Sequence, residues 1–75
     1  MASGLTEREC DVLWWMTAGK QNPEIAAILG ISLATVQKHV AHLIPKLKAE
    51  NRHAATVLAL RDMIAGGASF PPTTP

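Results

Sequence analysis

Residues 22–40 have the sequence NPEIAAILGISLATVQKHV, which predicts two helices joined by a tight turn. Pro23 suits the first helical position, where a missing amide costs nothing, so the shorter helix is expected to begin at Asn22. Gly30 predicts a left-handed stop, and Ser32 is a typical N-cap residue for the helix that follows. The segment therefore predicts a short helix, a glycine turn and a longer second helix.

Two more helices are expected, one on either side of this segment. Thr6 and Glu9 form the S/T-x-x-E pattern of a capping box, which predicts a helix that starts at Thr6 and stops at Gly19. The last helix is expected over about residues 52–65, ended by the glycine pair at 66–67. No segment has the pattern of a strand, so the predicted fold class is all-α with four helices.

The chain has 75 residues, which leaves room for one compact core and no second domain. Its hydrophobic fraction of 48 % is ample for that core, which small aliphatic side chains must fill because aromatic residues are scarce. We expect the folded domain to cover residues 5–66. Residues 1–4 are expected to be a linker or a cloning remnant, and residues 67–75 a disordered tail rich in Pro and Thr.

Several features favour a soluble, cytoplasmic protein with no membrane partner. No apolar stretch reaches the roughly 20 residues that a membrane span needs, and the chain does not start with a signal-peptide pattern. The single cysteine, Cys10, cannot form an internal disulfide. Its apolar helical context predicts a buried, unreactive thiol in a reducing compartment.

The two sides of the predicted helix at about residues 33–47 differ in character. At 100° per residue, one arc is apolar and is expected to face the core; it holds Val36, Val40, Leu43, Ile44 and Leu47. The opposite arc is small near its centre and polar at its start. Its members are Ala34, Gln37, Lys38, Ala41 and Pro45, with Thr35, His42 and Lys46 at its border.

This second arc suits the major groove of double-stranded DNA, which admits a helix only if its leading face is not bulky. Gln37 can pair with adenine and Lys38 with guanine, so both are expected to face bases. Hydroxyls, cations and helix-start amides suit phosphate oxygens, and the expected phosphate-facing residues are Ser32, Thr35, His42 and Lys46. The alternative for these side chains is an ordinary solvated helix face.

Charge is unevenly distributed along the chain, although the formal net charge is only +1. Residues 1–30 carry two basic and four acidic side chains, whereas residues 31–75 carry five basic and two acidic ones. With the three histidines added, the second half offers a modest basic surface for phosphate.

The last predicted helix is apolar on nearly all sides. One face can cover the core, but a second apolar face would remain in water, and such patches usually mark an interaction surface. We expect this face to pair two copies of the chain through Val57, Leu58, Arg61 and Ile64. The alternative is that surface alanines are simply tolerated. Trp14 lies beside the apolar stripe of the first helix, where it contacts either a sensor domain outside these residues or the domain's own surface.

Metal binding and catalysis find little support. His39 and His42 on one helix make at most half of a structural zinc site, and Cys10 lies on a different helix. We find no set of nucleophile, base and orienting group, and a domain this thin has little room for a pocket. We therefore expect no metal, no cofactor and no enzymatic activity.

Short motifs recur at a spacing that indicates a family. They are LTERECDVL at 5–13, NPEIA at 22–26, GIS at 30–32, TV at 35–36, HV at 39–40, KL at 46–47 and NR at 51–52. With these motifs the chain resembles the LuxR-type (GerE-like) helix-turn-helix domain. The resemblance implies a four-helix output domain of a transcription regulator, whose third helix enters the major groove and whose fourth pairs two copies. It implies base-facing positions for Gln37, Lys38 and Ala41, and a sensor or receiver domain outside these residues.

Departures from that family matter as well. The family usually has Lys where Gln37 stands, Lys or a similar residue where Pro23 stands, and Gly where Lys48 stands. Pro45 removes the amide that would bond to the Ala41 carbonyl, which predicts a kink or an early end of the helix there. The expected function is sequence-specific binding of double-stranded DNA. The alternative is a protein-interaction module on the same fold with weak or lost DNA binding.

Overall fold

The structure is a computed structural model that describes residues 4–64. Its elements are α1 (Glu7–Thr17), α2 (Asn22–Leu29), α3 (Leu33–Lys46) and α4 (Arg52–Ile64). The described residues form four helices and no strand, so the predicted all-α fold is confirmed. The expected linker lies outside the described residues except for Gly4, and the glycine stop at 66–67 and the tail at 67–75 lie outside them entirely.

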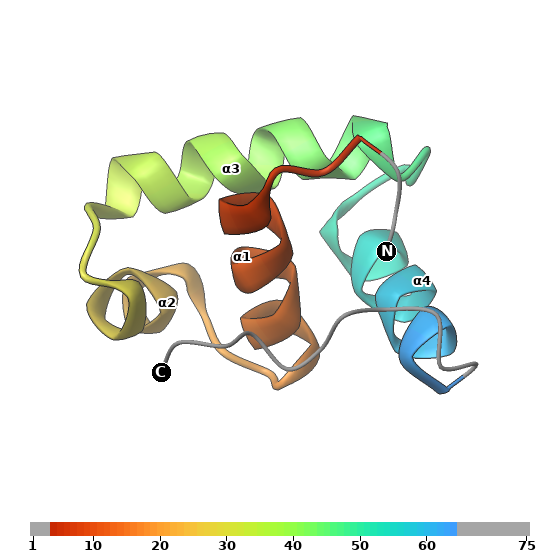
Figure 1. Ribbon diagram of the computed structural model, residues 1–75, viewed down its shortest axis with the longest axis horizontal. Helices are drawn as coiled ribbons and strands as arrows, with labels where there is room; N and C mark the ends of the chain where they lie inside the picture. Colours follow the sequence, from red (N-terminus) through yellow and green to blue (C-terminus); the bar gives the residue numbers. More distant parts are fainter. Residues whose placement is uncertain (1–3, 65–75) are drawn as a thin grey trace.

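The helices form a small bundle with α3 along one side (Figure 1). In this view α2 lies beneath the N-terminal end of α3, α4 lies near its C-terminal end, and α1 lies between them. α1 packs against α3 and α4, and α2 packs against α3. The axes of α2 and α3 are bent by 111° relative to each other, within the range of about 90–120° that is typical of a helix-turn-helix pair.

A membrane span is not offered by any single helix among residues 4–64, since none is long and apolar enough. Only α2 and α3 taken together, as the bent pair, reach the required length and composition.

All four helices contribute to one core. Its buried hydrophobic side chains are Val12, Leu13, Met16, Ile25, Ala26, Val36, Val40, Leu43, Ala55 and Ala59. The three alanines on α2 and α4 are short, which lets these helices approach their neighbours closely. The predicted apolar arc of α3 is confirmed, with Ile44 and Leu47 partly buried at its end. Trp15 also packs against this core, and its ring lies edge-on to Trp14 with centroids 6.3 Å apart.

Cys10 is half-buried, less than expected from its apolar context. Burial, and after it the neighbouring carboxylate of Asp11, raise the pKa of its thiol. Because the thiolate is the reactive form, a raised pKa disfavours a nucleophilic role.

The predicted helix starts and stops depend mainly on local hydrogen bonds. The Thr6 hydroxyl accepts from the Glu9 amide at 3.1 Å, and the Thr6 amide donates to Glu9 Oε1 at 2.9 Å, so the capping box is confirmed. Ser32 Oγ accepts from the Thr35 amide at 3.1 Å, as expected of the cap of α3. Gly30 ends α2 with φ of 69°, a left-handed conformation that only glycine adopts without strain.

α2 begins at Asn22 as expected, but Pro23 is its second helical residue and not its first. The N-cap is Gln21, whose amide donates to the Glu24 carboxylate at 2.8 Å, and Asn22 and Pro23 are the first two helical residues. The Asn22 side chain does not cap the helix; its Oδ1 accepts a hydrogen bond from Arg52 at 2.5 Å.

Pro45 lies inside α3, one residue before the helix ends at Lys46, where an end at about residue 47 was expected. The chain then makes a Schellman turn, in which the Lys48 amide donates to the Pro45 carbonyl at 2.9 Å and the Ala49 amide to the Ile44 carbonyl at 3.1 Å. This turn places Lys48 in the left-handed region with φ of 57°. Lysine thus occupies a conformation that favours glycine.

Candidate nucleic-acid interface

The outer side of α3 carries most of the predicted interface. This arc faces away from the core, and its exposed side chains are Ala34, Gln37, Lys38, Ala41, His42, Pro45 and Lys46. Thr35 is half-buried, and His39, at the border of the core, is half-buried as well. Small Ala34 and Ala41 leave the middle of the arc low, which allows close approach to a groove.

Two hydroxyls stand at the start of this arc. Ser32 Oγ and Thr35 Oγ1 lie 2.8 Å apart, a hydrogen bond in which either group can donate. Because each hydroxyl has a single proton, this bond leaves one of the two protons available to an incoming phosphate oxygen. The pair therefore offers one hydroxyl donor to a phosphate.

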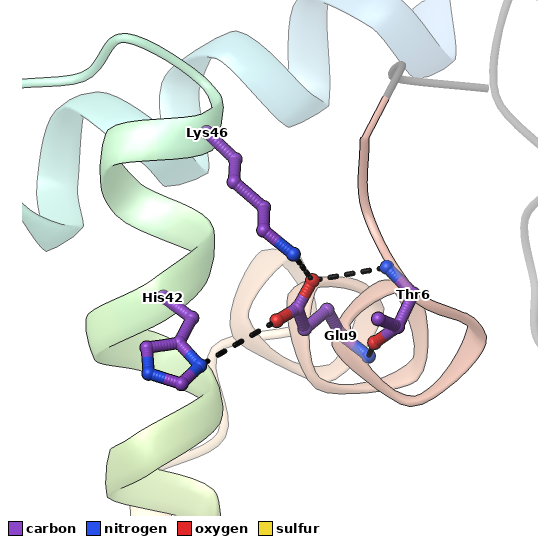
Figure 2. Close-up of polar contacts among 4 residues, drawn as sticks. All are labelled: Thr6, Glu9, His42 and Lys46. Atoms are coloured by element: carbon purple, nitrogen blue, oxygen red, sulfur yellow. Dashed lines mark hydrogen bonds and ion pairs between the residues drawn. The ribbon is translucent and has the colours of Figure 1, made fainter.

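The C-terminal half of the arc is linked to α1 by four residues, which we call the Glu9 cluster: Thr6, Glu9, His42 and Lys46 (Figure 2). Lys46 Nζ donates to Glu9 Oε1 at 2.8 Å, and His42 Nδ1 lies 4.0 Å from Glu9 Oε2. The Glu9 side chain is only 3 % exposed, compared with 36 % for Lys46 and 54 % for His42. Two of the four predicted phosphate-facing side chains, His42 and Lys46, therefore turn towards a buried carboxylate.

Burial raises the pKa of Glu9, but hydrogen bonds from Lys46 and Thr6 outweigh it, and the pKa lies below its ordinary value. Glu9 is thus charged at neutral pH, and it contacts both the cap of α1 and the exposed arc of α3. The capping-box pattern accounted only for the first of these roles. The contact with α3 could have been inferred from the position of Glu9 on the same helical stripe as the buried Val12, Leu13 and Met16. A carboxylate buried on that stripe needs a cationic partner.

Arg52 is a second residue whose role the sequence analysis missed. One guanidinium nitrogen donates to Asn22 Oδ1 at 2.5 Å and the other to the Lys20 carbonyl at 3.1 Å. These bonds tie the start of α4 to the start of α2. The NR motif at 51–52 was the available signal, but nothing in it indicates the partner 30 residues away.

α4 presents an apolar side that the core does not cover. Its exposed side chains include the predicted pairing residues Val57, Leu58, Arg61 and Ile64, and Ile64 is 86 % exposed. Leu60, which the sequence analysis did not single out, is exposed among them. Ala55 and Ala59 form the opposite, buried side.

Within the described part of the chain, no three His, Cys, Asp or Glu side chains come together in a group that could hold a metal ion. The polar side chains of the α3 arc instead have the character of a nucleic-acid interface: amide, hydroxyl and cationic groups on a narrow helix face.

Comparisons with known proteins agree with this geometry. The GerE family, described as bacterial regulatory proteins of the luxR family, matches residues 3–59. The chain is 48 % identical over 59 residues to the nitrate/nitrite response regulator protein NarP of Escherichia coli, which covers 79 % of this chain and 27 % of that protein. It is 42 % identical over 65 residues to the transcriptional activator protein EsaR of Pantoea stewartii, and this match covers 85 % of this chain and 26 % of that protein.

A solved structure described as VqmA bound to DPO superposes with a TM-score of 0.79 at 36 % identity, covering 92 % of this chain and 33 % of that one. The chain thus spans about a quarter of the length of these curated relatives and a third of that structure.

Proposed function

The chain belongs to the LuxR family of bacterial regulatory proteins, and we propose that it binds specific sequences of double-stranded DNA as the output domain of a transcription regulator. It acts by occupying DNA and not by chemistry. The single observation that carries this proposal is the bent α2–α3 pair, at 111°, whose second helix presents a narrow, exposed polar arc. In helix-turn-helix proteins the second helix lies in the major groove.

The N-terminal part of the arc supports base contacts. Gln37 and Lys38 are exposed and carry the donors and acceptors that base edges require, and small Ala41 lies one turn further along. Around them, the phosphate-facing residues are Ser32, Thr35, His42 and Lys46. Phosphate contacts set the register of the helix on the duplex, whereas base contacts set the sequence preference.

Two copies pair through α4 in this proposal, by way of Val57, Leu58, Arg61 and Ile64. Exposed apolar area on a terminal helix supports it, because such area is stabilised when a partner removes it from water. Two-fold pairing sets the two recognition helices about one DNA turn apart, ~34 Å, and predicts an inverted-repeat site.

The relatives support a wider arrangement. The chain matches about a quarter of the length of two relatives, one named as a nitrate/nitrite response regulator and the other as a transcriptional activator. We infer that this domain serves a longer cytoplasmic regulator, in which a sensor or receiver domain controls DNA binding through α4 or Trp14.

A titration of random-sequence duplex DNA at two salt concentrations, followed by fluorescence anisotropy, tests the proposal. We expect affinity to fall steeply with salt, because each phosphate neutralised contributes about −0.9 to the slope of log Kobs against log salt concentration. Lys38→Ala should then change the ranking of duplexes of different sequence, since a base contact is lost. No binding at low salt would overturn DNA binding as the function.

The second candidate is a protein-interaction module on the same fold. The observation that favours it is the ion pair between Lys46 and Glu9, which leaves the exposed arc of α3 less basic than its sequence indicates. In that case the apolar side of α4 binds a partner protein, and the same titration shows no salt-dependent DNA binding.

A further inference from the structure

The two lysines on the exposed arc of α3 differ in their electrostatic surroundings. Lys38 is exposed and has no ion pair among the described residues. The Lys46 ammonium, in contrast, lies 2.8 Å from Glu9 Oε1 (Figure 2). One of the two cations of the interface is therefore partly neutralised from within the protein.

The partner of Lys46 is held firmly in place. Glu9 is buried in α1, and its Oε1 accepts both the Thr6 amide at 2.9 Å and the Lys46 ammonium at 2.8 Å. Because its pKa lies below the ordinary value, the carboxylate keeps its charge throughout the neutral range. Burial and two hydrogen bonds thus hold the carboxylate beside the Lys46 ammonium.

We propose that Glu9 is a positioning residue that sets how strongly the C-terminal half of α3 binds the DNA backbone. It fixes the Lys46 ammonium at the surface and partly compensates its charge. The electrostatic attraction between Lys46 and a DNA phosphate is therefore weaker than that of a lysine without an ion pair. The inference rests on the proposed DNA-binding function and adds a limit on its backbone affinity.

The geometry supports both parts of this role. An ammonium has three donors, and the bond to Glu9 uses one, which leaves two for a phosphate oxygen. A phosphate on those donors lies well within one Debye length of the carboxylate, about 8 Å at physiological salt. The repulsion between the two anions is therefore only weakly screened, and His42, beside Glu9 Oε2, is the side chain that faces the same carboxylate.

Glu9→Gln tests the charge while keeping the shape of the side chain. A glutamine also serves in a capping box, so α1 keeps its cap. On a random-sequence duplex we expect the salt slope to steepen by up to about 0.9, the value for one additional neutralised phosphate, and the affinity at low salt to rise about 3- to 10-fold.

Glu24→Gln is the matched control. Glu24 is also the acceptor of a capping box, from the Gln21 amide at 2.8 Å, and its loss changes the net charge by the same amount. It has no lysine partner among the described ion pairs. If Glu24→Gln steepens the slope as much as Glu9→Gln does, net charge explains the effect and the inference is wrong.

Lys46→Met shows whether the effect passes through Lys46. In that background we expect Glu9→Gln to leave the slope unchanged; a persisting increase would overturn the inference. Lys46→Met alone should lower the slope by less than half of the 0.9 expected for a free phosphate contact, and a full loss would contradict compensation. This second measurement decides the matter if Glu9→Gln fails to fold. Absence of salt-dependent binding by the unaltered protein is a different result, because it refutes the proposed function itself.

Discussion

The two ends of α3 are built in different ways. Its start follows Gly30, which has a φ of 69°, and is capped by Ser32, whose hydroxyl oxygen accepts a hydrogen bond from the Thr35 amide. Its end follows a proline, places Lys48 at φ of 57°, and is tied through Lys46 to a carboxylate 37 residues earlier in the chain. The start is therefore locally determined, whereas the end depends on tertiary contact with α1. Substitutions at one end at a time test this difference.

The largest expected effect is at the end of the helix. Lys46→Met leaves the Glu9 carboxylate buried without its ammonium partner. Breaking a fully buried pair costs about 3–5 kcal/mol, and since Lys46 is partly exposed we expect a loss of about 2 kcal/mol in the free energy of unfolding. Denaturant unfolding measures it. Lys38→Met, on the same helix but without an ion pair in residues 4–64, should change stability by less than about 0.5 kcal/mol.

A smaller effect is expected at the start. Ser32→Ala removes the hydroxyl that accepts the Thr35 amide and should cost about 1 kcal/mol. Thermal unfolding would show this as a fall of roughly 4–8 °C in Tm for a domain of this size. Ser32→Asp restores an acceptor and should recover most of the loss. If Ser32→Ala proves as costly as Lys46→Met, the proposed difference between the two ends is wrong.

The features that the sequence predicted correctly are those that depend on local contacts. The capping box at Thr6, the cap at Ser32, the left-handed Gly30 and the apolar arc of α3 depend on residues within one or two turns of each other, and all were predicted from the sequence. The contact of the Asn22 side chain with Arg52, 30 residues along the chain, was not predicted.

The same holds within the candidate site. Helical periodicity showed which side chains leave the core, and the exposed arc agrees with it. Periodicity says nothing about where a long side chain ends, so the turn of Lys46 and His42 towards Glu9 was not foreseen. Such contacts depend on how α1 crosses α3, which a single sequence does not specify.

A stabilising change is expected at the end of α3. Lys48→Gly removes a side chain from a left-handed position, and the gain is reduced by the greater freedom of glycine in the unfolded chain, leaving about 0.5 kcal/mol. Lys48→Ala keeps the Cβ atom and should give no gain. Denaturant unfolding of the two variants compares them directly, and equal stabilities would mean that the strain relieved at this position does not exceed the entropic cost of glycine.

The smallest expected effect is a pH dependence that isolates Glu9. Its folded pKa is depressed, so its contribution to stability is present above the pKa of the unfolded chain, about 4.3, and is lost as pH falls through the folded value. We therefore expect the Tm difference between the unaltered protein and Glu9→Gln to shrink as pH falls from about 5 to 3. Asp11, whose pKa is raised by burial, is present in both proteins and cancels in this difference. A Tm difference that stays constant or grows over this range would mean that the contact between α1 and the end of α3 does not depend on the charge of Glu9.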